Sequence, residues 1–152
     1  MEEMFFTSTE ASKLTGCSRR QLQYWREKGV VVPTVNASGK GRNVYYSVSD
    51  LLQLMVMEYL LSVGLSFETA QESLEMLKKD HPEIFKADVP SEDLKRLMIL
   101  MSPNNLELAI YDAEEAFLRV NRLGLPLVPF WSDRIHGRLR DNLKQFKEKL
   151  EK

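Results

Sequence analysis

The feature that most constrains this chain is a short turn, residues 15–18, between two helical segments. Residues 9–14 have a helical pattern that stops at Gly16, a residue type that ends helices because it tolerates a left-handed backbone. Ser18 offers a hydroxyl that can cap a second helix, which we expect over residues 19–28. Two helices of this length, joined by so short a turn, predict a helix-turn-helix.

The second of these helices has an apolar side and a polar side. Leu22 and Trp25 are three residues apart and share one face, which predicts that Trp25 belongs to the core. The other sides carry groups able to contact nucleic acid: Arg19, Arg20, Gln23 and Tyr24. Arginine can donate two hydrogen bonds to guanine or phosphate, and glutamine can pair with adenine. A solvated polar face is the alternative to a DNA contact.

A short β-hairpin is predicted after the second helix. Residues 30–33 form a β-branched run that is too short for a helix, and residues 44–46 supply a returning strand. The stretch between them is rich in turn-forming residues, including a glycine on either side of Lys40. A hairpin with a basic tip is the pattern of a wing, whose Lys40 and Arg42 would neutralise phosphates or enter a minor groove.

Two longer helices should follow the hairpin. Ser47 and Asp50 have the spacing of an N-cap and an acid in the first turn, and an apolar run continues to Gly64. Ser66 can cap another helix, in which apolar residues recur every three or four positions. These elements together predict a winged helix-turn-helix DNA-binding domain over residues 1–82.

Residues 83–152 also carry helical patterns. We expect one helix from about residue 90 to Ser102, before Pro103. Apolar side chains of the next segment repeat as in a heptad seam: Leu106, Ile110, Ala113, Phe117 and Val120. A last amphipathic helix is expected over residues 132–152. The fold class is therefore mainly α: a winged helix-turn-helix with a small β-hairpin wing, followed by a helical dimerisation and candidate effector region.

The heptad seam suggests a homodimer, because soluble proteins rarely leave such an apolar stripe exposed. The side chains assigned to this interface are Leu106, Ile110, Phe117, Leu139, Leu143 and Phe146. Phe117, Phe130 and Trp131 are candidates for a small-molecule effector pocket, next to a proline-rich break between two helices. Aromatic residues at such spacings also occur in cores and interfaces, and that alternative stays open.

Charge is unevenly distributed along the 152 residues, although the formal net charge is only −1. Residues 11–46 hold seven basic side chains and one acidic, whereas residues 47–115 hold five basic and fourteen acidic. Residues 116–152 are basic again. A basic segment next to an acidic one is typical of a DNA-binding module attached to a part of the protein that does not contact phosphate. A solvated basic face gives the same pattern.

Composition disfavours several classes of site. Cys17 is the only cysteine and there are two histidines, which excludes an internal disulfide and makes a zinc site a poor candidate. Phosphate-binding glycine loops, nucleophile elbows and metal-spaced clusters are missing, so we expect no enzyme, no cofactor and no metal. No segment approaches the roughly 18 unbroken apolar residues of a membrane helix, and the acidic N-terminus lacks a secretory n-region. We expect the protein to be in the cytoplasm, associated with the nucleoid.

Three motifs in residues 5–80 occur in a defined order. The first is LTGCSRRQLQYWREKGV, which begins at Leu14; YSVSDL follows at residues 46–51 and GLSFE at residues 64–68. They resemble the pattern L-T-G-V-S-x-R-T-L-R-Y-Y-E-x-x-G-L, the wing exit and helix start, and the G-[FM]-S-L-E-E corner of the MerR family of transcriptional regulators. Because several motifs agree in order and spacing, the resemblance is specific.

This resemblance implies a sequence-specific transcriptional regulator that binds a pseudo-palindromic operator in double-stranded promoter DNA as a homodimer. In the family the bound dimer distorts promoter DNA, so RNA polymerase is a candidate further partner and either activation or repression can result. The DNA-binding residues assigned by the motifs and by the resemblance are Arg19, Arg20, Gln23, Tyr24, Lys40, Arg42, Tyr45 and Tyr46.

The chain departs from the family pattern at three positions. Gln23 stands where arginine is common, Trp25 replaces a second tyrosine, and Cys17 replaces a buried valine or isoleucine. We expect Cys17 to pack in the core rather than to act as a redox or metal sensor.

Two other functions stay open. A protein-binding adaptor of the chaperone-modulator type keeps this fold but should lose the cations of the second helix and wing, which are present here. An excisionase-like architectural DNA-binding factor would usually be a shorter, single winged helix without the extension.

Overall fold

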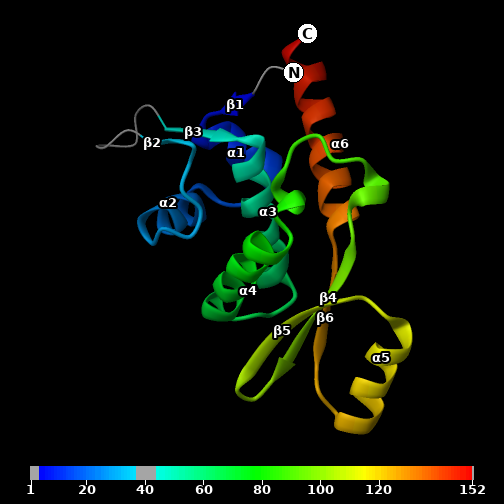
Figure 1. The fold of residues 1–152 in the computed structure, drawn as a ribbon. Coiled ribbons are helices and arrows are strands. Elements are labelled where there is room, and N and C mark those ends of the chain that lie inside the picture. Colours follow the sequence, from blue (N-terminus) through cyan, green and yellow to red (C-terminus); the bar gives the residue numbers. More distant parts are fainter. Residues whose placement is uncertain (1–3, 37–43, 152) are drawn as a thin grey trace.

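The structure is a computed structural model that describes residues 4–36 and 44–151. Its helices are α1 (Ser8–Thr15), α2 (Arg19–Glu27), α3 (Val48–Ser62), α4 (Phe67–Asp80), α5 (Ala113–Leu118) and α6 (Ser132–Leu150). Short helical turns are η1 (Pro82–Phe85), η2 (Ser91–Asp93) and η3 (Arg119–Leu123). The strands are β1 (Phe5–Phe6), β2 (Val35–Asn36), β3 (Val44–Ser47), β4 (Arg96–Ser102), β5 (Asn105–Ile110) and β6 (Leu127–Trp131). Helix is the main secondary structure, as predicted (Figure 1).

The predicted pair of short helices and the turn between them are present. α1 ends at Gly16, whose φ of 81° is a left-handed conformation that glycine adopts without a Cβ clash. At the start of α2, the Ser18 hydroxyl accepts the N–H of Gln21 while the Gln21 side chain accepts the N–H of Ser18. Leu22 and Trp25 are buried, so the predicted apolar face of α2 is confirmed.

A three-stranded antiparallel sheet of order β1-β3-β2 adjoins these helices. The sequence places the first hairpin strand at residues 30–33, but β3 pairs with Val35–Asn36 instead. Val30 and Val31 are buried against the core, and the N–H of Val30 donates to the carbonyl of Trp25 at 2.8 Å. Burial rather than strand pairing therefore explains this β-branched run. β1 is too short to give a periodic pattern, and the sequence did not predict it.

α3 lies at the centre of the N-terminal half and carries much of its core. Eight of its residues are buried, and its start is fixed by the predicted cap, in which Ser47 and Asp50 bond reciprocally. The elements α1, α4, η1 and α6 all pack against it. α4 begins at its predicted cap, where the hydroxyl of Ser66 accepts the N–H of Thr69.

The second half of the chain is not all helical, which corrects the prediction of a helical region over residues 83–152. Residues 96–102 and 105–110 form an antiparallel hairpin of β4 and β5, joined at Pro103 and Asn104. Three consecutive residues of β4 are buried, so both of its faces are covered. Periodicity cannot separate a short apolar run of this kind from a buried helix, which explains the error.

The heptad seam predicted over residues 106–120 is also absent, because the segment is divided between β5 and α5. Leu106 and Leu108 alternate with the exposed Glu107, as strand residues do, and Asp112 caps the separate helix α5. After α5 and η3 the chain enters β6, which pairs with the other side of β4. The resulting sheet has the order β5-β4-β6.

α6 is the last predicted helix, and it returns from this sheet to the N-terminal half (Figure 1). Nδ2 of Asn142 donates to the carbonyl of Leu14 at 2.9 Å, which ties α6 to α1. The rings of Phe6 and Phe146 meet edge to face with their centroids 6.0 Å apart. Neither α6 nor any other helix in the described part of the chain is long and apolar enough to cross a membrane.

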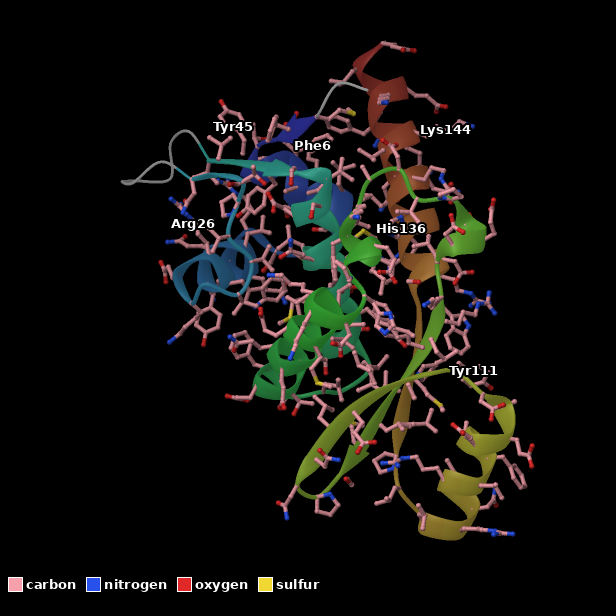
Figure 2. The ribbon with its side chains drawn as sticks, viewed as in Figure 1. Phe6, Arg26, Tyr45, Tyr111, His136 and Lys144 are labelled. Carbon is pink, nitrogen blue, oxygen red and sulfur yellow. The ribbon has the colours of Figure 1, made fainter. Side chains whose placement is uncertain are left out.

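His136 is buried on α6 and joins that helix to η1 (Figure 2). Its Nε2 lies 2.5 Å from the carbonyl oxygen of Ile84. Burial lowers the pKa of His136 below its ordinary value of 6.5, and the hydrogen bond to Ile84 opposes this only in part. The unfolded chain therefore takes up a proton at a higher pH than the folded chain does.

From this difference we expect stability to be complete above pH 6.5 and to fall as the pH drops through 6.5 toward the lower folded-state pKa. His136→Gln should remove this contribution, so its free energy of unfolding should depend less on pH between about pH 7 and pH 5. Chemical denaturation at a series of pH values measures the slope. Equal slopes in the two proteins would contradict the role given to His136.

Candidate nucleic-acid interface

The exposed side of α2 carries the polar groups predicted from the sequence to contact DNA. Arg19, Arg20 and Gln23 are all exposed, because the apolar face of the helix is turned into the core. Within the described residues, neither arginine has a carboxylate at ion-pair distance, so both guanidinium groups can reach an external partner. Nε2 of Gln23 donates to Glu27 at 3.2 Å in a solvent-exposed bond that another partner can replace.

Tyr24 lies at the edge of this face and is held from two sides. Its ring centroid lies 5.4 Å from that of Phe67 at the start of α4, and Nζ of Lys28 lies 5.7 Å from the Tyr24 centroid. Tyr24 nevertheless stays 44% exposed. Lys28 was not predicted as a DNA-binding residue from the sequence, although it follows Tyr24 by four residues, which is the spacing of neighbours on one helix face.

The two tyrosines of β3 point to opposite sides, as neighbours on a strand must. Tyr45 is 39% exposed and lies on the same side of the molecule as Arg26 (Figure 2). Tyr46 is 1% exposed, and burial raises the pKa of its hydroxyl. Of these two predicted contacts, only Tyr45 presents a surface to a partner.

A network behind this surface fixes α2 and β2 relative to α3. Nε of Arg26 donates to Oδ1 of Asn36 at 2.7 Å, which joins α2 to β2. The buried carboxylate of Asp50 accepts from the N–H and the hydroxyl of Thr34, both at 2.7 Å, and from the N–H of Ser47 at 2.9 Å. The segment that leads into β2 is thereby tied to the first turn of α3.

Lys40 and Arg42, the predicted wing contacts, lie outside the described residues. The strands on either side of them are described: β2 and β3 pair antiparallel, with Asn36 opposite Val44. The chain therefore leaves and re-enters the described structure at the end of this strand pair.

The residues predicted for a dimer interface and an effector pocket are widely spread. Four of them pack against the chain's own core: Leu106, Leu139, Leu143 and Phe146. Ile110 and Phe117 are exposed. Phe117 and Trp131 line one apolar hollow of about 870 Å³ between α5 and β6, whereas Phe130 is fully buried.

Cys17 is buried, as predicted, and its thiol donates to the carbonyl of Leu54 at 3.4 Å. Burial raises the pKa of this thiol to about 11, and the hydroxyl of Thr15 lowers it in part. A thiol with this pKa stays protonated near neutral pH and is a poor nucleophile. Over residues 4–36 and 44–151 no group of three His, Cys, Asp or Glu side chains is placed to hold a metal ion.

Comparison with known proteins concerns the N-terminal half. Residues 6–77 match the family model described as "MerR HTH family regulatory protein". Over 75 residues the chain is 31% identical to an uncharacterized HTH-type transcriptional regulator of Mycobacterium bovis and to proteins of the same description from two strains of Mycobacterium tuberculosis. The aligned part is 49% of this chain and 33% of each relative, so the match spans about a third of those proteins.

We expect Asp50→Ala to lower the free energy of unfolding by about 2 kcal/mol, because it leaves the buried N–H of Ser47 and the part-buried donors of Thr34 without their acceptor. Denaturation followed by circular dichroism measures the loss. Ser66→Ala removes an exposed N-cap and is the matched control, with an expected loss of about 1 kcal/mol. Equal losses would mean that Asp50 acts as a helix cap and nothing more.

Proposed function

We propose, from the match of residues 6–77 to the MerR family of helix-turn-helix regulators, that the chain is a sequence-specific transcriptional regulator that binds promoter DNA as a homodimer. The observation that carries the proposal is the exposed face of α2, where Arg19, Arg20 and Gln23 stand together. α2 would be the recognition helix.

The chemistry of α2 suits the major groove, which admits a helix and displays a distinct pattern for each base pair. Arg20 can donate two hydrogen bonds to guanine, and Gln23 can donate to and accept from adenine. Tyr24 and Lys28 lie at the edge of the face, where a hydroxyl and an ammonium group would bind phosphate. Base contacts would thus be central and phosphate contacts peripheral.

The pair of strands β2 and β3 would provide a second contact, on the same side of the molecule as α2 (Figure 1). Lys40 and Arg42 would bind phosphate or enter a minor groove, and Tyr45 would donate to phosphate. The bond between Arg26 and Asn36 fixes the spacing of α2 and β2. Helix and hairpin would therefore approach DNA as one unit.

Arg20→Ala and Lys40→Ala should affect DNA binding in different ways. The change at Arg20 should weaken operator binding by about 1–3 kcal/mol and reduce discrimination between sequences, because a base contact is lost. The change at Lys40 should weaken binding to all sequences alike and make the slope of log affinity against log salt shallower by about one. Fluorescence anisotropy over a salt series, with a site recovered by genome-wide DNA pull-down, measures both effects.

Lys86→Ala is the control for these variants, because Lys86 is an exposed lysine outside the proposed interface. It should keep the wild-type affinity and salt slope. A flat pull-down profile for the wild type as well as for Arg20→Ala would show that the chain does not read DNA sequence, and would favour the protein-binding adaptor.

A second copy of this chain is the partner we assign to the exposed apolar side chains of α5 and η3. Phe117, Val120 and Leu123 are 64%, 53% and 64% exposed and recur at helical spacing. Phe117 and Val120 also line the hollow between α5 and β6. A second copy would remove this apolar surface from water.

The charges around this surface favour an antiparallel pairing of two α5 helices. Each α5 starts with Asp112, Glu114 and Glu115, and Arg122 lies at the far end, in η3. When two such helices pack in opposite directions, the acidic start of one meets Arg122 of the other. A two-fold axis produces this arrangement, and a pseudo-palindromic operator has the same symmetry.

Phe117→Asp combined with Val120→Asp should convert the dimer to monomers and weaken operator binding, because each copy then holds only one half-site. Sedimentation velocity at micromolar concentrations and anisotropy measure the two effects. Val63→Asp, at an exposed apolar residue that ends α3, is the control and should stay dimeric. A monomeric wild-type protein at these concentrations would exclude this interface.

A further inference from the structure

A second hollow lies where α3, β6 and α6 meet, and like the hollow beside α5 it is lined mainly by apolar surface. Its volume is about 290 Å³, just below the range of roughly 300–1,000 Å³ that is typical of ligand pockets. The side chains that line it are Tyr59, Pro129, Trp131, Arg134, Ile135 and Arg138. The hollow therefore combines aromatic walls with two guanidinium groups.

Both aromatic walls are fixed by neighbours. The hydroxyl of Tyr59 donates to the carbonyl of Pro129, which joins α3 to β6. The guanidinium of Arg96 lies 5.2 Å from the Trp131 ring centroid, and the Tyr111 ring meets Trp131 edge to face at 4.8 Å. Walls that are already ordered can take up a flat ring with little loss of side-chain entropy.

The charge at this hollow comes from α6. Arg134 and Arg138 are four residues apart and so project from the same side of the helix. Arg138 lies 3.9 Å from a carboxylate oxygen of the partly buried Glu58 in a loose ion pair, and Arg134 has no ion pair within the part of the chain that is described. Asp133 is engaged by Arg96 at 3.0 Å. Of the two guanidinium groups, only that of Arg138 is paired with a carboxylate, so the charge of Arg134 leaves the hollow positive.

We propose that this hollow binds a small aromatic carboxylate, with its ring between Tyr59 and Trp131 and its carboxylate on Arg134 and Arg138. A planar guanidinium group presents paired donors that match the two oxygens of a carboxylate. An amide of the same shape would keep the ring contacts but lose the charge-assisted hydrogen bonds. A cation would be repelled.

The position of the hollow connects ligand binding to the N-terminal half. α3 carries Tyr59 near one end and Asp50 near the other, while α6 carries both arginines and Asn142, which bonds to α1. A ligand that bridges α3 and α6 therefore acts on two helices that support the helix-turn-helix. Control of DNA affinity by the ligand rests on the proposed function, whereas binding of the ligand does not.

Benzoate and benzamide are the probes, because they share a shape and differ in charge. The chain has two tryptophans, Trp25 in the core and Trp131 in the hollow, so an isotope-labelled sample gives two indole N–H signals in its NMR spectrum. Benzoate should shift the Trp131 signal and leave the Trp25 signal in place. Benzamide should bind about tenfold more weakly or worse. Trp131→Phe assigns the two signals.

Arg134→Gln and Arg138→Gln should each weaken benzoate binding by about tenfold. Arg140→Gln, at an exposed position of the same helix that does not line the hollow, is the matched control and should bind as the wild type does. The proposal is overturned if the Trp131 signal does not move, if the two probes bind equally, or if both glutamine variants at the hollow retain full affinity.

The titration contains no DNA, so its result is independent of the proposed function. Intact benzoate binding without any operator binding would contradict the proposed function alone. If both proposals hold, the benzoate concentration needed to change operator affinity is about tenfold higher for Arg134→Gln than for the wild type.

Discussion

The burial of α3 is the constraint on which the rest of the structure depends. This helix is apolar around most of its circumference, and a helix of that kind must be covered on all sides. α1, α4, η1 and α6 provide the cover, and the capping box of Ser47 and Asp50 attaches β3 and the segment before β2 to its first turn. The orientation of α2 is thus decided by the packing of a helix that lies behind it.

The N-terminal half was predictable because its signals are local. Ser18, Ser47 and Ser66 cap helices as expected, since few residue types can satisfy the first N–H groups of a helix. The exposed face of α2 follows once Leu22 and Trp25 fix its rotation. The resemblance to the family also pointed to Tyr46, which is buried. The alternation of side chains along a strand could have shown this, because Tyr45 and Tyr46 must face opposite sides and only one of them can be exposed.

Apart from α6, the C-terminal half was not predictable, because contacts between distant segments decide its fold. β4 is covered on both faces and pairs with strands on both sides, and no local pattern records those partners. Leu106 and Ile110 fit a heptad by spacing although they lie on a strand. The hollow at the junction brings α3 next to β6 and α6, about 70 residues further along the chain, and of its lining residues only Trp131 was predicted as a pocket residue. Arg134 and Arg138 can be recognised as lining residues only when α6 is placed beside α3.

The bond between Asn142 and Leu14 joins residues 128 positions apart, and this separation orders events during synthesis. A ribosome adds roughly 5–20 residues per second, so α6 is made on the order of several seconds after α4. Until then the side of α3 that α6 covers has no cover from its own chain. Each nascent molecule therefore spends part of its synthesis with an apolar surface of α3 uncovered. Several ribosomes on one message would bring such surfaces close together.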